Sequence, residues 1–116
     1  MVMKYYHKLY TDDELCLKWK EVQIKLKHDE LLLNTYLIAL TQNEANHLEF
    51  FDAVYVQKKM MNSEDLFVIG MAEGYKGAVS VVQKILQEVL CKTGGTNIRG
   101  YLLAQQRQYE ESNEKV

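Results

Sequence analysis

The chain has 116 residues, enough for one domain with a single modest core, and 47% of them are hydrophobic and 26% charged. This balance excludes a disordered chain, and the formal net charge of −2 lacks the basic surplus that a general nucleic-acid binder carries. The apolar runs are far shorter than a membrane span, and the polar, aromatic start at 1–10 lacks the apolar core of a signal peptide. We therefore expect a cytoplasmic protein with no membrane and no nucleic-acid partner.

The first predicted element is a helix from Asp12 to about His28. Thr11 and Glu14 have the spacing of a capping box, which satisfies free amide groups at a helix start. One stripe at helical spacing follows, made of Leu15, Trp19, Val22 and Leu26. An alternative stays open, because apolar and polar residues also alternate over 22–26, which is a strand pattern.

A second apolar line runs along the opposite side of this predicted helix. Leu17, Ile24 and Leu31 recur at sevenfold spacing. One small domain has little surface left to cover this line, so we interpret it as a candidate interface with a second copy of the chain.

The next elements are a buried strand over 34–41, a helix over 44–61 and a second buried strand over 66–71. A helix over 75–92 has a polar stripe opposite a broad apolar face, and a face that wide is expected to pack on a sheet. Gly94 has the position of a left-handed C-cap, and a last helix then runs from 96 to about Tyr109. The tail over 110–116 is expected to be disordered.

This order predicts a small single-domain α/β (or α+β) fold. It has two or three strands with a β-α-β crossover and parallel pairing, an N-terminal helix and two C-terminal helices. Two strands make a poor sheet on their own. Either a third strand is hidden near 22–26, or another subunit covers a sheet edge or a helix face. We therefore expect a homodimer.

The turn that precedes the 75–92 helix resembles a degenerate dinucleotide-binding fingerprint. Gly74 and Gly77 follow a strand and open a helix, where glycines let a pyrophosphate approach the amide groups. However, Ala72 stands where the first glycine belongs, and no strand ending in an acidic residue follows about 20 residues on. We interpret Gly74 as a turn residue and Gly77 as a site of close helix–strand packing, and we keep both as candidate ligand contacts.

A polar cluster follows the first predicted strand and contains Asn43, Glu44, Asn46 and His47. Strand ends that feed helices are where α/β folds place their sites. Glu44 and His47 also have the spacing used in di-metal helical bundles, which need a second such pair that this chain lacks. We predict no metal and no cofactor. The alternative interpretation is that Asn43 caps a helix and Glu44 lies at its positive end.

Cys16 and Cys91 lie far apart in the chain, and neither forms a motif with a histidine. We expect two reduced, partly buried thiols and no catalytic cysteine.

The segments 36–51 (YLIALTQNEANHLEFF) and 65–78 (DLFVIGMAEGYKGA) resemble small uncharacterised bacterial proteins of unknown function. The resemblance implies a bacterial, cytosolic protein and brings no activity and no functional residue with it.

The sequence thus favours a non-catalytic binding or interaction module that acts as a homodimer, with a further protein partner left open. The alternative is a binder of a phosphate- or nucleotide-type small molecule, or an enzyme acting on one, whose site lies where 43–47 and 70–77 meet at the ends of adjacent parallel strands.

Overall fold

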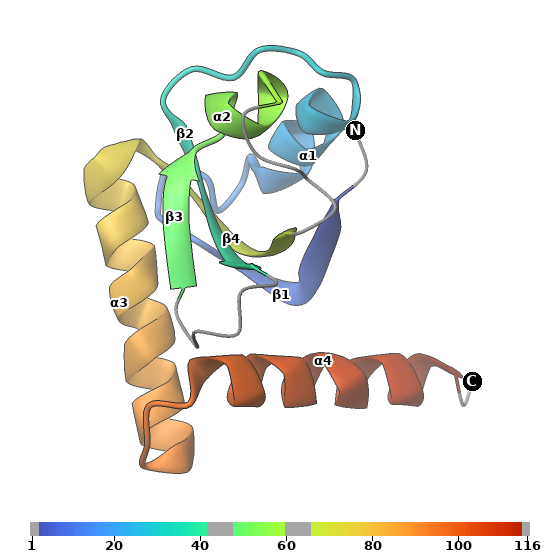
Figure 1. The fold of residues 1–116 in the computed structure, drawn as a ribbon, viewed down its shortest axis with the longest axis vertical. Coiled ribbons are helices and arrows are strands. Elements are labelled where there is room, and N and C mark those ends of the chain that lie inside the picture. Colours follow the sequence, from blue (N-terminus) through green and yellow to red (C-terminus); the bar gives the residue numbers. More distant parts are fainter. Residues whose placement is uncertain (1–2, 42–47, 60–65, 115–116) are drawn as a thin grey trace.

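A computed structural model describes residues 3–41, 48–59 and 66–114, which form a mixed α/β fold around a four-stranded sheet (Figure 1). The strands are β1 (Lys4–Thr11), β2 (Thr35–Thr41), β3 (Leu48–Asp52) and β4 (Leu66–Glu73), in the order β1-β4-β2-β3. β4 is parallel to β1 and antiparallel to β2, and β2 is antiparallel to β3. β1 and β3 are therefore the two edges of the sheet.

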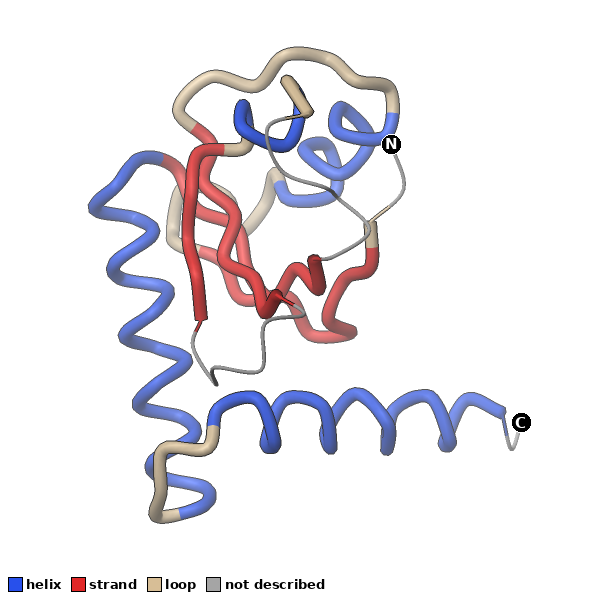
Figure 2. The backbone as a smooth tube through the Cα atoms, viewed as in Figure 1, coloured by secondary structure: helices blue, strands red, loops and turns tan. Residues whose placement is uncertain are grey.

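The helices are α1 (Trp19–Lys27), α2 (Val54–Gln57), α3 (Gly74–Thr93) and α4 (Ile98–Glu114). Figure 2 shows α3 along the left of the strands, α1 and α2 above their upper end, and α4 crossing below them. None of these helices is long and apolar enough to cross a membrane.

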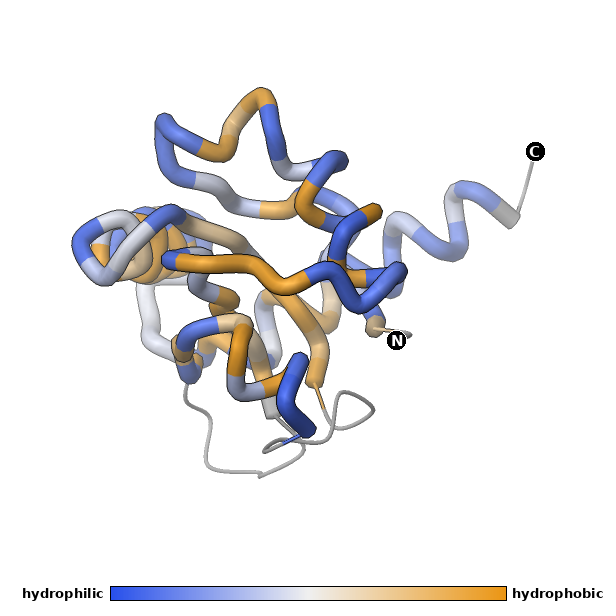
Figure 3. Tube along the Cα trace, turned by 90° about the horizontal axis from the view of Figure 1, so that it is seen from above, coloured by the Kyte–Doolittle hydropathy of each residue, from blue (hydrophilic) through white to orange (hydrophobic). Residues whose placement is uncertain are grey.

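The strands build two hydrophobic clusters, because successive residues of a strand point to opposite faces of a sheet. In β2, Leu37 and Ala39 join the cluster under α1 and α2, whereas Ile38 and Leu40 join the cluster under α3. The buried side chains of α3 are Ala78, Val81, Ile85 and Val89. Both faces are covered, so the central strands are apolar nearly throughout. Figure 3 shows this concentration of hydrophobic residues in the middle of the molecule.

Several predicted elements are confirmed. The strands expected at 34–41 and 66–71 are β2 and β4, the helix expected at 75–92 is α3, and the last helix is α4. Gly94 ends α3 with φ of 72° in the left-handed region, and its N–H donates to the carbonyl of Leu90. The segment 22–26 lies in α1 and is helical. The α/β class is correct, although the sheet has four strands instead of two or three.

The N-terminal prediction is wrong in two respects. Lys4–Thr11 forms the edge strand β1, and helix α1 begins only at Trp19. Thr11 therefore ends a strand and does not cap a helix. The cause is the pairing of β1 with β4, which continues through Thr11 opposite Met71 and leaves 12–18 to turn back toward the sheet.

The predicted helix over 44–61 is also wrong where the structure describes it. Leu48–Asp52 forms β3, and only Val54–Gln57 is helical. Aromatic residues favour strands where neighbouring strands can cover them, and here Phe50 and Phe51 pack on opposite faces of the sheet.

The expected β-α-β crossover is wrong as well. β2 and β4 are neighbours, but they are antiparallel, and the parallel pair is β1 with β4. In addition, residues 110–114, expected in a disordered tail, belong to α4. Cys16 and Cys91 are free, but both are exposed, not partly buried as expected.

Candidate functional site

The turn into α3 holds the two glycines that the sequence singles out. Gly74 has φ of 74°, and its N–H donates to the carbonyl of Asn34. Gly77 lies one turn further on, directly against the carboxylate of Asp12 and the methyl group of Ala72. Any side chain at position 77 would collide with that carboxylate, so the predicted close packing at Gly77 is what the structure shows.

Asp12 occupies the place near this helix start where an anionic ligand would bind. The residue is only 7% exposed, and it follows directly after β1. Its Oδ1 accepts the N–H of Leu15 at 3.0 Å, and its Oδ2 accepts the N–H of Glu73, the residue before α3, at 3.0 Å. A helix N-terminus favours a negative charge, and here the protein supplies that charge itself. The arrangement ties β1 to β4 and α3.

The other half of the predicted ligand site, Asn43, Glu44, Asn46 and His47, lies outside the described residues. The strands that flank this segment are informative, however. Thr41 pairs with Leu66 at the start of β4, whereas Gly74 follows the end of β4. Since β2 and β4 are antiparallel, β2 ends at the end of the sheet opposite to Gly74 and Gly77. The expected meeting of the two halves depended on parallel strands, which this sheet does not have there.

A second polar cluster joins β1, α3 and α4 around Glu88. One oxygen of its carboxylate, Oε2, accepts the hydroxyl proton of Tyr10 and, at 3.1 Å, that of Tyr101. The ring of Tyr6 stacks on that of Tyr10, with centroids 5.9 Å apart. Three elements thus meet at one carboxylate, which stabilises their junction.

The environment of these tyrosines keeps their hydroxyls protonated. Burial raises the pKa of Tyr5 to about 12. Burial, together with the charges of Tyr101 and Glu88, raises that of Tyr6 to about 12. Burial and then the hydrogen bond to Glu88 raise the pKa of Tyr10 and of Tyr101. A phenol with a raised pKa stays protonated near neutral pH and is a weaker acid than usual, so the cluster is suited to holding the fold together and not to proton transfer.

The raised tyrosine pKa values predict a loss of stability in alkaline solution. A folded chain that keeps a proton which the unfolded chain has lost becomes less stable as the pH rises. The free energy of unfolding is therefore expected to fall between pH 10, the ordinary tyrosine value, and about 12. Urea unfolding across this range measures the slope. Tyr6→Phe, at a site 4% exposed, should make the decline shallower. An equal slope in the variant and the wild type would contradict the assignment.

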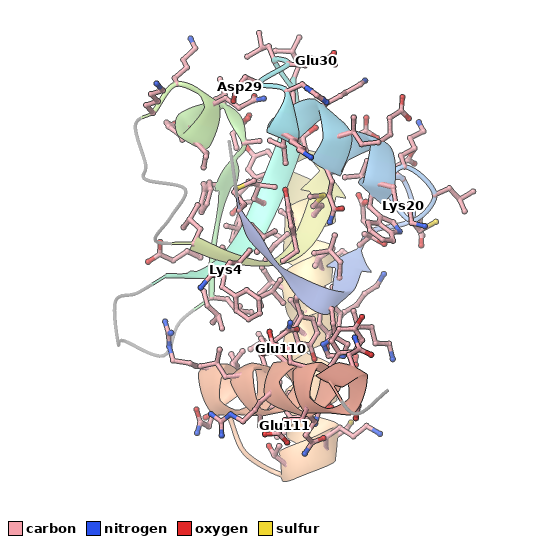
Figure 4. The ribbon with its side chains drawn as sticks, turned by 90° about the vertical axis from the view of Figure 1, so that its right-hand side faces the viewer. Lys4, Lys20, Asp29, Glu30, Glu110 and Glu111 are labelled. Carbon is pink, nitrogen blue, oxygen red and sulfur yellow. The ribbon has the colours of Figure 1, made fainter. Side chains whose placement is uncertain are left out.

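A groove of about 600 Å³ opens between α4 and the first residues of β1 and β4. Figure 4 shows Glu110 on the side of α4 that faces the sheet and Glu111 on the far side. The described lining mixes apolar side chains with charges of both signs: Tyr5, Phe67, Leu103, Lys4, Arg107 and Glu110. These residues include no cysteine, serine or histidine that could act as a nucleophile.

The side of α3 that faces β3 carries uncovered apolar residues. At its start, Tyr75 lies 5.5 Å from Phe50 of β3 and 6.4 Å from Tyr36 of β2, measured between ring centroids. A line of apolar residues continues from Tyr75 along the helix at spacings of three and four residues. Together with the outer edge of β3 we name this region the α3–β3 surface; its side chains are Phe50, Tyr75, Val79, Val82, Leu86 and Leu90.

The exposure of this surface is substantial. Tyr75, Leu86 and Leu90 are 62%, 43% and 55% exposed, and Phe50, Val79 and Val82 are half-buried. Figure 1 shows α3 running alongside β3. The opposite side of α3 is polar and occupied, because Lys84 donates to the carbonyl of Thr11 and Glu88 binds two tyrosines. Contiguous exposed apolar surface is commonly found at interaction sites.

The predicted interface residues Leu17, Ile24 and Leu31 are also exposed, at 94%, 58% and 60%. Only Ile24 belongs to α1, because Leu17 precedes the helix and Leu31 follows it. Their spacing predicts one apolar stripe along a single helix, and the structure does not form that stripe. Their role in an interface stays a prediction.

Comparison of the chain with known protein families, curated proteins and solved structures finds no match. Within the described ranges, no group of three or more histidine, cysteine, aspartate or glutamate side chains is placed to hold a metal ion.

Sequence reasoning missed Asp12 and the α3–β3 surface. The sequence predicts Asp12 as the first residue of a helix. In the structure it precedes a turn, and its carboxylate accepts the backbone N–H of Glu73 at the end of β4. Phe50 lies within the helix predicted over 44–61, and that prediction hid the edge of β3. The signal that could have found β1 is the tyrosine-rich stretch Lys4–Thr11, since tyrosine and threonine favour strands.

Proposed function

We propose that this protein is a non-catalytic binding module that acts as a homodimer. The observation that supports the proposal is the α3–β3 surface, where exposed apolar side chains of one helix adjoin an edge strand. Removing such surface from water contributes about 25 cal/mol for each Å² buried. A second copy presents the same surface, so a two-fold contact covers both at once.

The two edges of the sheet differ in a way that favours this proposal. At β1, Gln106 of α4 accepts the backbone N–H of His7 at 2.8 Å, and Lys84 of α3 donates to the carbonyl of Thr11 at 3.2 Å. At β3, within residues 3–41, 48–59 and 66–114, no side chain bonds to the backbone of Leu48–Phe51. Among the described residues, side chains thus cover the backbone of the β1 edge and not that of the β3 edge, which favours a partner at β3.

The alternative, a phosphate- or nucleotide-type ligand at the start of α3, is not favoured. Asp12 already places a carboxylate against Gly77 and on the N–H of Glu73. A bound phosphate would have to displace a buried, hydrogen-bonded anion or lie beside it. The cytoplasm remains the expected location, in agreement with two free thiols.

Sedimentation equilibrium at micromolar concentration tests the homodimer. The expected mass is twice the 13.6 kDa of one chain. The double variant Tyr75→Lys/Leu86→Lys introduces charges into the α3–β3 surface at exposed sites, so it should fold and sediment as a monomer. Leu33→Lys, at a site 79% exposed before β2, is the matched control and should remain dimeric. If the double variant has the same mass as the wild type, the α3–β3 surface is not the interface.

A further inference from the structure

The backbone groups of β3 divide into an inner and an outer set. The N–H of Ala53 donates to the carbonyl of Thr35 at 2.8 Å, which fixes that pair as hydrogen-bonded. In an antiparallel ladder, hydrogen-bonded and non-bonded pairs alternate. The next hydrogen-bonded pairs along the ladder are therefore Leu37 with Phe51 and Ala39 with Glu49. The backbone groups of Phe51 and Glu49 thus point inward and bond to β2. The outward-facing residues are therefore Leu48, Phe50 and Asp52.

Among the residues that the structure describes, this outer edge lacks most of the usual protection of edge strands. Natural proteins block such edges with charged side chains, lysine above all, and with proline, bulges or a covering element. The strand LEFFD contains neither lysine nor proline, and its register with β2 is regular from Tyr36 to Leu40. On the face of the sheet that carries α3, Phe50 contacts Tyr75, the first of the exposed apolar residues of that helix. An unprotected edge beside an apolar helix face is suited to receive another strand.

We infer that two copies of the chain join their β3 strands antiparallel, about a two-fold axis at Phe50, to form one continuous sheet. The inference rests on the proposed homodimer and assigns its contact. In this register Leu48 faces Asp52 of the partner subunit, and Phe50 faces Phe50 of the partner subunit. Every outward N–H and carbonyl of the three outer residues then finds a partner.

The side chains of β3 are compatible with this pairing. Glu49 faces Phe51 of the partner subunit, so no carboxylate lies directly opposite another. The two Phe50 rings lie together on the face that also carries α3, where each already contacts the ring of its own Tyr75. The same axis places the two α3 helices on one face of the joined sheet, with their exposed apolar lines toward each other. A single two-fold operation thus covers the strand edge and the helix side.

A pair of lysine variants tests this contact against the competing one. Phe50→Lys places two ammonium groups at the two-fold axis and is expected to weaken dimerisation about 100-fold or more. Leu17→Lys changes the interface suggested by the spacing of Leu17, Ile24 and Leu31, at a site 94% exposed, and should leave the dimer intact. Sedimentation gives the mass of each, and circular dichroism confirms that each is folded. A dimer that survives Phe50→Lys and dissociates with Leu17→Lys would overturn the inference and keep the proposed homodimer.

Hydrogen exchange on the wild-type chain tests the strand register without relying on that variant. In the dimer, the amides of Phe50 and Asp52 should exchange slowly, and they should exchange at least about tenfold faster in the monomeric Tyr75→Lys/Leu86→Lys variant. The amides of Glu49 and Phe51 bond to β2 and should stay protected in both. A wild-type dimer in which Phe50 exchanges as fast as in the monomer would overturn the strand pairing. A monomeric wild type would overturn the proposed homodimer itself.

Discussion

Replacing Asp12 by alanine is expected to lower the free energy of unfolding by about 2–4 kcal/mol. The carboxylate accepts the N–H groups of Leu15 and Glu73, each at 3.0 Å, and its removal takes away the acceptor of both. The favourable charge near the start of α3 is lost as well. Because Asp12 ties β1 to β4, the edge strand β1 should separate from β4 at a lower urea concentration than in the wild type. Urea unfolding followed by circular dichroism measures the change.

Asp13→Ala is the matched control, because this aspartate is adjacent in sequence but exposed. Its effect is expected to stay within about 0.5 kcal/mol. Asp12→Asn retains one acceptor oxygen and should fall between the two. If Asp12→Ala and Asp13→Ala lose the same stability, Asp12 does not hold the turn into α3.

Gly77→Ala is expected to destabilise the protein by about 3 kcal/mol, even though alanine is the better helix former. Gly77 lies in the first turns of α3, where the added methyl group would collide with the Asp12 carboxylate and press on Ala72 Cβ at 3.3 Å. The carboxylate has little room to move, since both of its oxygens hold backbone amides. Thermal and urea unfolding both report the loss.

Gly95→Ala provides the comparison, because the nearest atom to its added methyl group is Thr93 Oγ1 at 3.9 Å. This variant should change stability by less than about 1 kcal/mol. The two substitutions have the same chemistry, and only at Gly77, inside α3, does the added methyl group collide with a neighbour. A Gly77→Ala protein more stable than the wild type would show that α3 and Asp12 are not packed as described.

The elements that sequence reasoning predicted correctly are those whose pattern is local. Helix α3 has a polar stripe opposite an apolar face and a glycine C-cap, and β2 and β4 are short apolar runs. Each of these signals comes from residues within one element. The close approach at Gly77 was also predictable, because a glycine that follows a strand and opens a helix commonly permits such packing.

The elements that were wrong depend on distant partners. β1 is a strand because β4 lies beside it, with Lys4 opposite Phe67 more than sixty residues away in the chain. Leu48–Asp52 is a strand because β2 covers one of its edges. Nothing within either segment distinguishes strand from helix as strongly as this pairing does. The direction of β2 relative to β4 likewise follows from the whole topology, and it removes the adjacent parallel strands on which the predicted ligand site depended.

The candidate sites divide in the same way. The glycine turn was found from its spacing, but the carboxylate that occupies it comes from the end of β1. The expectation of a homodimer came from surplus apolar surface. The broad face of α3 was part of that argument, and its uncovered side now belongs to the α3–β3 surface. The role of Phe50 and of the β3 edge could not be predicted without knowing the strand order, which places β3 at the edge of the sheet.

The most direct measurement of the central proposal is the mass of the wild-type chain in solution, determined by sedimentation equilibrium from about 1 to 100 micromolar. The account predicts a homodimer of twice 13.6 kDa that dissociates when the α3–β3 surface carries Tyr75→Lys/Leu86→Lys. A folded wild-type monomer of 13.6 kDa throughout this range would contradict it.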